Sequence, residues 1–221
     1  MGANLEFDRQ RFSQLLPTAS ASRSIYCYPT VDSTNRILWD HLQAGAATGT
    51  VVLAQQQTAG RGQWGRPWVS APGGLYCSLA IAPQLPVAKG GRITLASAWG
   101  VARQLRSLGV PVALKWPNDL YLHSRKLGGI LTETAVRRGV IHQAVIGIGV
   151  NWTNPVPPNA IALGTVSRAV GGLEHLAALV ILGLEEGCDA IASPQGWSEV
   201  LQDYPRWLGT PLSPEIDLDQ L

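Results

Sequence analysis

The spacing of apolar positions changes several times along the chain and predicts an order of strands and helices. Between residues 75 and 81, apolar residues alternate with smaller or polar ones, which is typical of a strand. Over 92–108 they recur every three to four positions, and Gly109-Val110-Pro111 would end the helix that this predicts. Further strands are predicted over 25–30, 50–54, 112–116, 126–135 and 141–150, with one helix beginning after Asp32-Ser33-Thr34-Asn35 and another near 173–192.

The order of these elements favours an α+β fold. Strands follow one another with few helices between them, which predicts a mixed, mostly antiparallel sheet with helices packed on it. No G-x-G-x-x-G sequence opens a helix after a strand, so a dinucleotide-binding crossover is not expected. We expect a lead-in over 1–24, a core over 25–192, and a tail over 193–221.

Composition narrows the class of protein. The chain has 221 residues, with 46% hydrophobic and 14% charged, as expected for a globular domain with a real core. With 17 Lys and Arg against 15 Asp and Glu, the net charge of +2 is too small to predict a nucleic-acid or membrane surface. The three cysteines form no C-x-x-C pair, and we find no signal peptide or membrane span, so a cytoplasmic location is expected.

The segment Gly60-Arg61-Gly62-Gln63-Trp64-Gly65-Arg66-Pro67-Trp68 is the first candidate for chemistry. Glycines let backbone N–H groups approach a ligand closely, and arginines offer several donors to carboxylate or phosphate oxygens. Tryptophan adds a flat face for a ring. The composition predicts a loop around a small anion that carries an aromatic group, such as a nucleotide. A glycine-rich surface turn with solvated arginines would have the same composition.

A second candidate segment holds two lysines in otherwise apolar surroundings. Pro117-Asn118-Asp119 predicts a turn between strands, and by itself could be an ordinary hairpin tip. However, Lys115 and Lys126 lie in stretches that otherwise indicate burial, and a buried lysine requires a partner. We expect Asp119 to pair with one of them and a bound acid to pair with the other.

The third segment is Gly147-Ile148-Gly149-Val150-Asn151-Trp152. Two glycines near the end of a strand indicate close approach by a ligand or a neighbouring segment, although a bulged strand end would also explain them. Asn151 could bond to a nucleotide. The four histidines lie far apart in sequence, and no Ser-His-Asp or Cys-His arrangement is apparent, so an enzyme of this sequence would take its nucleophile from the substrate.

Five motifs together resemble the biotin protein ligases, over about residues 25–190. They are Asp32-Ser33-Thr34-Asn35, Gln57-Thr58-Ala59-Gly60-Arg61-Gly62, Lys115-Trp116-Pro117-Asn118-Asp119, Arg125-Lys126-Leu127-Gly128-Gly129-Ile130-Leu131 and Gly147-Ile148-Gly149-Val150-Asn151. The resemblance implies a core like that of class II aminoacyl-tRNA synthetases. It also implies an enzyme that couples biotin to ATP, giving biotinyl-5′-AMP, and then transfers biotin to a lysine of a biotin carboxyl carrier domain of acetyl-CoA carboxylase.

The same resemblance implies roles for individual residues. Catalysis would involve Lys126, Arg61 and Asp119, with Asp119 also holding Mg²⁺. The biotin site would comprise Ser33, Thr34, Asn35, Gln57, Gly60, Arg61, Gly62, Gln63, Lys126 and Gly129. ATP would be bound by Arg66, Trp68, Lys115, Asn118, Asp119 and Asn151. The loop over 60–72 would act as a lid that excludes water from the mixed anhydride.

Two departures from the family pattern bear on function. The family commonly has Gly-Arg-Gly-Arg where this chain has Gln63, which removes a cation from the lid and would loosen retention of the intermediate. Many members carry a small β-barrel after the core, of which the residues after 192 would be at most a remnant. We expect no DNA-binding domain before Ile25 and regard a homodimer as possible. The alternatives are a lipoate or octanoate ligase relative, favoured less by Lys115-Trp116-Pro117, and a non-catalytic biotin sensor.

Overall fold

The computed structural model describes residues 7–17, 23–210 and Leu218. Its elements, in chain order, are α1 (Arg9–Leu15), β1 (Ile25–Tyr28), α2 (Thr34–Gln43), β2 (Val51–Ala54), η2 (Gln63–Gly65), β3 (Leu75–Ile81), β4 (Leu85–Pro86), η3 (Val87–Lys89), α3 (Gly91–Ser107), β5 (Ala113–Lys115), β6 (Asp119–Leu122), β7 (Arg125–Arg137), β8 (Val140–Val150), α4 (Leu163–Val166), α5 (Leu173–Ala192) and α6 (Pro194–Trp207).

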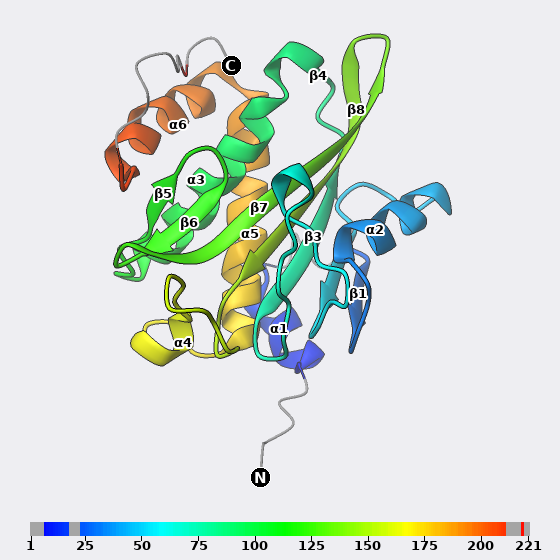
Figure 1. The fold of residues 1–221 in the computed structure, drawn as a ribbon. Coiled ribbons are helices and arrows are strands. Elements are labelled where there is room, and N and C mark those ends of the chain that lie inside the picture. The colour runs from blue at the N-terminus through cyan, green and yellow to red at the C-terminus, as the bar shows by residue number, and fades with distance from the viewer. Residues whose placement is uncertain (1–6, 18–22, 211–217, 219–221) are drawn as a thin grey trace.

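One sheet organises the molecule, as Figure 1 shows. Its strand order is β1-β2-β3-β8-β7-β6-β5, with the short β4 paired to β8. β1 and β2 run parallel, whereas every other recorded pair of named strands in the described residues is antiparallel. This confirms the α+β class with a mixed, mostly antiparallel sheet. None of the described helices combines the length and apolar character that crossing a membrane requires.

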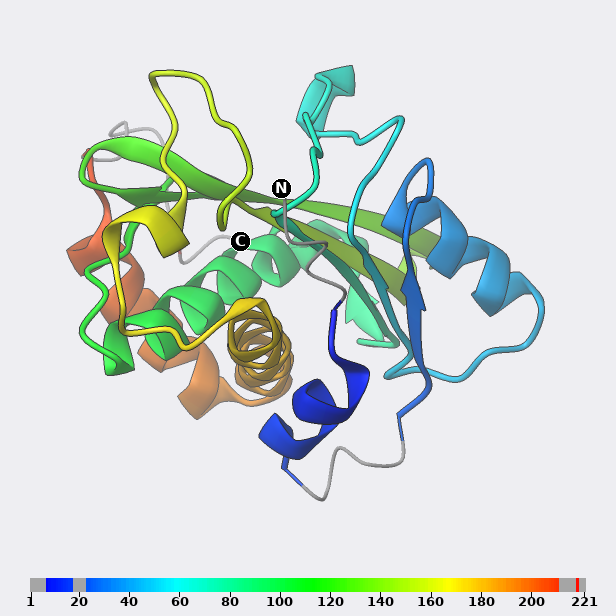
Figure 2. The same ribbon diagram turned by 90° about the horizontal axis from the view of Figure 1, so that it is seen from below.

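The two faces of the sheet carry different layers (Figure 2). Helices α3, α5 and α6 lie on one face and bury the main core there with α1. α3 and α5 pack very closely where Gly100 meets Gly183. A Cβ on Gly100 would lie only 2.0 Å from the carbonyl oxygen of Gly183, so this contact requires a glycine. On the opposite face α2 covers a small cluster of Leu38, Val52, Ala80 and Val145. The rest of that face is left for the loops that build the site.

The predicted elements recur with informative differences. Apolar residues alternate along β3 as expected, yet the intervening Tyr76, Ser78 and Ala80 are also buried, because α2 and the site cover their face. The extra strand β6 follows the predicted turn directly. Ser33 is the N-cap residue of α2, but its side chain makes no capping hydrogen bond.

The ends of the chain contribute to the same core. The lead-in contains α1, whose Phe12 is buried among the core residues. A tail was expected from residue 193, but 194–207 form α6, which buries Trp197, Val200 and Tyr204 in the core that α3 and α5 share. Residues 211–217 and 219–221 lie outside the described part, so a remnant of the β-barrel there stays a prediction.

Candidate active site

A cavity of about 300 Å³ lies on the face of the sheet that the main helices leave open. The start of α2, the loop that contains η2, the turn between β5 and β6, the first half of β7 and the end of β8 all line it. The lining residues are Ser33, Thr34, Asn35, Gln57, Arg61, Gly62, Gln63, Trp64, Arg66, Pro67, Trp68, Lys115, Trp116, Pro117, Asn118, Asp119, Lys126, Gly129, Ile130, Leu131, Gly147, Ile148 and Gly149.

Glycines in β8 allow two of these segments to approach the sheet. A Cβ on Gly147 would lie 2.1 Å from Oδ1 of Asn35, and one on Gly149 would lie 2.3 Å from Nε1 of Trp68. Both distances are far below van der Waals contact, so any larger residue would displace the start of α2 or the loop. The expected close approach at these glycines is therefore confirmed, and the approaching groups are neighbouring segments of the chain.

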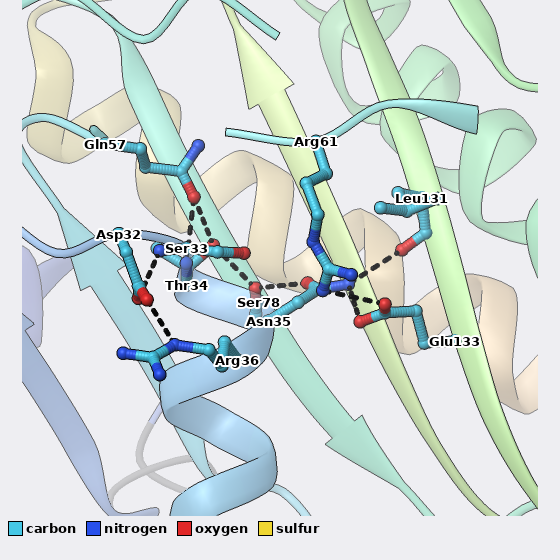
Figure 3. A network of polar contacts seen from close by, with 10 residues as sticks. All are labelled: Asp32, Ser33, Thr34, Asn35, Arg36, Gln57, Arg61, Ser78, Leu131 and Glu133. Atoms are coloured by element: carbon cyan, nitrogen blue, oxygen red, sulfur yellow. Dashed lines mark hydrogen bonds and ion pairs between the residues drawn. The ribbon is translucent and has the colours of Figure 1, made fainter. Parts of the chain in front are cut away.

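A chain of polar contacts joins the loop base to the start of α2 (Figure 3). Oε1 of Gln57 accepts hydrogen bonds from the backbone N–H of Thr34, at 2.8 Å, and from its hydroxyl, at 3.2 Å. Oγ of Ser78 lies 2.8 Å from Oγ1 of Thr34 and 2.7 Å from Oδ1 of Asn35. Thr34, Asn35 and Ser78 are buried and Gln57 is half-buried, and together they form a fixed polar surface at one end of the cavity.

Two ion pairs lie at the cavity. Nη2 of Arg61 is 2.8 Å from Oε1 of Glu133, and Nζ of Lys126 is 2.8 Å from Oδ1 of Asp119. The second pair confirms that Asp119 partners one of the two lysines. Nζ of Lys126 also lies 5.3 Å from the centre of the Trp68 ring, within the range of a cation–π contact. Arg61 and Lys126 line the same cavity, as the proposed chemistry requires.

Lys115 and Asn118 lie at the turn between β5 and β6. Lys115 is exposed and contacts Tyr121, with Nζ 3.4 Å from the phenol oxygen. Nδ2 of Asn118 donates to the carbonyl of Ile130 at 2.8 Å, which ties the turn to β7. From α6, the hydroxyl of Tyr204 donates to the carbonyl of Pro117 at 3.2 Å. Burial and the nearby Asp119 raise the pKa of Tyr204, so it stays a neutral donor.

The fit of Mg²⁺ depends on Asp119. Among the residues that line the cavity in the described chain, it is the one carboxylate. No group of three His, Cys, Asp or Glu side chains in the described ranges could hold a metal ion. Mg²⁺ is typically held by one or two carboxylates together with substrate phosphates and water, so Asp119 fits an ion delivered with ATP but not a resident metal site.

The loop over 60–68 is held mainly by its own backbone. The N–H of Gly62 donates to the carbonyl of Arg66 at 2.7 Å, and that of Trp68 to the carbonyl of Gly60 at 2.9 Å. At its tip, Trp64 has φ of 61° and is 90% exposed. A bulky residue at positive φ is unusual, and the exposed Trp64 side chain offsets this conformational cost with almost no buried surface.

The cavity gathers most of the residues that the sequence nominated. Gly60 and Asn151 are the exceptions. Gly60 has no room for a Cβ, because the carbonyl oxygen of Trp68 would lie 2.4 Å away. Asn151 is buried behind the site, where Nδ2 donates to the carbonyl of Lys126 at 3.4 Å and Oδ1 accepts from Asn154 at 3.0 Å.

Sequence reasoning missed three supporting residues, namely Ser78, Glu133 and Tyr204. Ser78 was read only as one of the small positions of a strand, and Glu133 as part of another strand. Tyr204 was placed in the tail. Cys27, Cys77 and Cys188 lie outside the cavity lining. Burial raises the pKa of all three thiols, that of Cys188 to about 12.

Comparison with known proteins identifies the family. Residues 27–151 match the model of the Biotin/lipoate A/B protein ligase family. The chain belongs to this family. Among curated relatives, the bifunctional ligase/repressor BirA of Escherichia coli is 41% identical over 166 residues, which cover 72% of this chain and 51% of BirA. The biotin--[acetyl-CoA-carboxylase] ligase of Mycobacterium tuberculosis is 32% identical over 188 residues, covering 80% of this chain and 69% of that protein.

Solved structures of the same family have the same fold. The biotin protein ligase of Leishmania major in complex with biotin superposes with a TM-score of 0.69 at 25% identity, covering 88% of this chain and 84% of that one. The chain spans about half the length or less of the bifunctional relatives that it matches.

Proposed function

We propose that this member of the Biotin/lipoate A/B protein ligase family is a biotin protein ligase. It activates biotin with ATP to biotinyl-5′-AMP and transfers biotin to a lysine of a biotin carboxyl carrier domain. The observation that carries the proposal is a single cavity with three features. It is lined by the polar surface of Gln57, Thr34 and Asn35, by the cations Arg61 and Lys126, and by Trp68.

Relatives support the choice of biotin. Curated relatives are named as biotin ligases of acetyl-CoA carboxylase, and a structural neighbour from Helicobacter pylori was solved with bound biotinylated ATP. The family description also covers lipoate ligases. The fixed polar surface favours biotin over lipoate, because the ureido group of biotin needs donors and acceptors where the dithiolane ring of lipoate has none.

In the first step, a carboxylate oxygen of biotin attacks the α-phosphorus of ATP. The new P–O bond forms as the bond to the β-phosphate oxygen breaks, and pyrophosphate leaves with the electron pair. Two anions must meet for this to happen, so Arg61 and Lys126 offset their repulsion and stabilise the charge that develops on phosphate oxygens. Lys126 can do so from a fixed position, because Asp119 and the face of Trp68 hold its ammonium group.

In the second step, the amine of the acceptor lysine attacks the carbonyl carbon of the mixed anhydride. The amide bond forms, AMP leaves with the electron pair of the broken C–O bond, and the amine loses a proton. Gly62, Gln63 and Arg66 lie on the loop beside the cavity, where they would limit the access of water to the anhydride.

The nucleotide would occupy the part of the cavity near Arg66, Trp68, Lys115 and Asn118. Nε1 of Trp68 supports this placement, because it is buried and has no hydrogen-bond partner in the described residues. A buried donor of this kind is costly unless an acceptor reaches it. Mg²⁺ bound by the phosphates and Asp119 would offset phosphate charge. Asn151 would not contact the nucleotide directly. Its hydrogen bond to the carbonyl of Lys126 would help to place that lysine at the cavity.

A cytoplasmic location, an acetyl-CoA carboxylase acceptor and a homodimer belong to the same proposal. The acceptor follows from the names of relatives such as the Mycobacterium tuberculosis ligase. Free cysteines with raised thiol pKa values are compatible with a reducing compartment. Light scattering with and without biotin would test for the homodimer.

The test is biotin-dependent exchange of labelled pyrophosphate into ATP, followed by native mass spectrometry for bound biotinyl-AMP. We expect exchange with biotin and none with lipoate, and transfer to a carrier domain at substoichiometric enzyme. Exchange with lipoate alone would make the chain a lipoate ligase. Biotin binding without exchange or transfer would make it a sensor and contradict the proposal.

A further inference from the structure

Glu133 places a negative charge beside the cavity and has no role in the chemistry described above. Both of its carboxylate oxygens are engaged. Oε1 pairs with Nη2 of Arg61 at 2.8 Å, and Oε2 accepts a hydrogen bond from Nδ2 of Asn35 at 2.9 Å. Glu133 therefore bridges the start of α2 and the loop over 60–68, from the middle of β7, as Figure 3 shows.

The contacts of Asn35 fix Glu133 from its buried side. Asn35 is 3% exposed and Ser78 is fully buried. Oδ1 of Asn35 accepts from the hydroxyl of Ser78, which sets the orientation of the amide, and Nδ2 then donates to the carbonyl of Leu131 at 3.3 Å as well as to Glu133. These contacts use both Nδ2 hydrogens of Asn35 to fix the amide and Glu133, while Oδ1 keeps a second lone pair for a ligand in the cavity.

Arg61, in contrast, has little else to hold it. Its side chain is 50% exposed, and the loop that carries it is held mainly by backbone bonds of its own. A free arginine side chain must lose rotamer entropy when it binds an anion. The recorded ion pair with Glu133 engages one guanidinium nitrogen, and a guanidinium has five donors, so others stay available for a second anion.

We propose that Glu133, fixed by Asn35 and Ser78, is a positioning residue that holds the Arg61 guanidinium at the cavity, ready for the carboxylate of the acid substrate. This inference rests on the proposed function, because biotin supplies that carboxylate. Glu133 lowers the ordering cost of Arg61 when biotin binds, and the guanidinium that the two carboxylates share offsets their repulsion.

A double-mutant cycle with two ligands tests the inference. Glu133→Gln, Arg61→Ala and the double variant are titrated by calorimetry with biotin and with biotinol, in which a CH₂OH group replaces the carboxylate. Glu133→Gln should raise the dissociation constant of biotin about tenfold, as expected for the loss of a charge-assisted hydrogen bond. The dissociation constant of biotinol should stay within about twofold of its wild-type value. In the Arg61→Ala background, Glu133→Gln should have no further effect.

Glu199→Gln is the matched control, because Glu199 also pairs with an arginine, Arg103 at 3.0 Å, on helices away from the cavity. It should change neither affinity. Glu133→Asp keeps the charge, but its side chain is one methylene shorter and cannot reach both Arg61 and Asn35. It should therefore weaken biotin binding, as Glu133→Gln does. This variant tests the inference even if Glu133→Gln does not fold.

Three results would overturn the inference. Tighter biotin binding by Glu133→Gln would mean that Glu133 competes with the substrate for Arg61. Equal weakening of biotin and biotinol would place Glu133 at the ring or in the scaffold. Additive losses in the double variant would show that it does not act through Arg61. If the wild-type protein binds neither ligand, the proposed function itself fails, which is a separate result.

Discussion

The two walls of the cavity are held in different ways. On the sheet wall, Asp119 pairs with Gly129 across β6 and β7, and Gly129 pairs with Gly149 across β7 and β8. On the loop wall, residues 60–68 bond mostly to one another, and the recorded contacts with the sheet are side-chain contacts. Arg61 reaches Glu133, and Trp68 lies over Gly149 and Lys126.

This difference assigns different tasks to similar charges. Lys126 is placed by the ladder of β7 before any ligand arrives, so it suits the step in which charge develops on phosphate. Arg61 is placed by one carboxylate at the end of a long side chain, so it can shift as a ligand enters and leaves. In the proposed function, Lys126 on the fixed wall would act from a set position, whereas Arg61 on the adjustable wall would join it in the chemistry and also respond to the ligand as it enters and leaves.

The largest effect is expected from the fixed wall. Lys126→Ala should lower the rate of adenylation by about 10²- to 10³-fold, as for other single groups that stabilise developing charge. The fold should persist, because the Lys126 side chain is one-third exposed and its ammonium group contacts Asp119 and Trp68 at the cavity. Pyrophosphate exchange measures the rate, and thermal unfolding measures the fold. Lys89→Ala, at an exposed site on η3, is the control. A lower unfolding temperature together with an unchanged rate of adenylation by the folded protein would show that Lys126 is structural.

The contact between the walls gives the next largest effect. Gly149→Ala would place a Cβ 2.3 Å from Nε1 of Trp68, so the indole must move away from the sheet. We expect a loss of about 1–3 kcal/mol in the free energy of unfolding, as for other overpacked sites, together with weaker ATP binding by calorimetry. Gly171→Ala is the control, because a Cβ there would lie 3.6 Å from Nδ1 of His175, which is an ordinary van der Waals distance. Unchanged ATP affinity would separate Trp68 from the nucleotide site.

The fixed wall was the more predictable of the two from sequence. Lys126 stood out because a lysine in an apolar stretch requires a partner, and the predicted partner Asp119 is present at 2.8 Å. The glycines of β8 correctly predicted that other groups approach the strand closely, but they did not indicate which groups these are. Glu133 could not be found in this way. Its partner Arg61 is far away in sequence, and a charge within a strand does not indicate which cation the fold will bring to it.

Other omissions were avoidable. The residues that α6 buries, Trp197, Val200 and Tyr204, have helical spacing, and Ser193 with Pro194 is a typical helix start. This pattern in the sequence predicts a helix where a tail or a remnant of the β-barrel was expected. The burial of the second face of β3, in contrast, could not be predicted from the sequence. It depends on α2 and the site loops, which the local alternation of residues does not reveal.

A smaller effect is expected from the charge of the adjustable wall. Gln63 lines the cavity, so Gln63→Arg would add a cation near the adenylate phosphate. Because the loop is partly exposed, we expect release of biotinyl-AMP to slow by only roughly three- to tenfold. Release is measured by the loss of enzyme-bound adenylate after dilution into a trap. Gln63→Leu, of similar size without charge, is the control. If both variants retain the adenylate equally, then shape and not charge sets retention.

The smallest effect concerns the tip of the adjustable wall, where Trp64 has a φ of 61° and is 90% exposed. Asparagine tolerates this left-handed region better than a bulky residue does, and Trp64→Asn removes almost no buried surface. The free energy of unfolding by urea should therefore rise by about 0.5–1 kcal/mol. Val69→Asn, at a 75% exposed position of the same loop without positive φ, should bring no such gain. Destabilisation by Trp64→Asn would mean that the indole, despite its exposure, helps to hold the loop, and the adjustable wall would then be less adjustable than its few contacts with the sheet suggest.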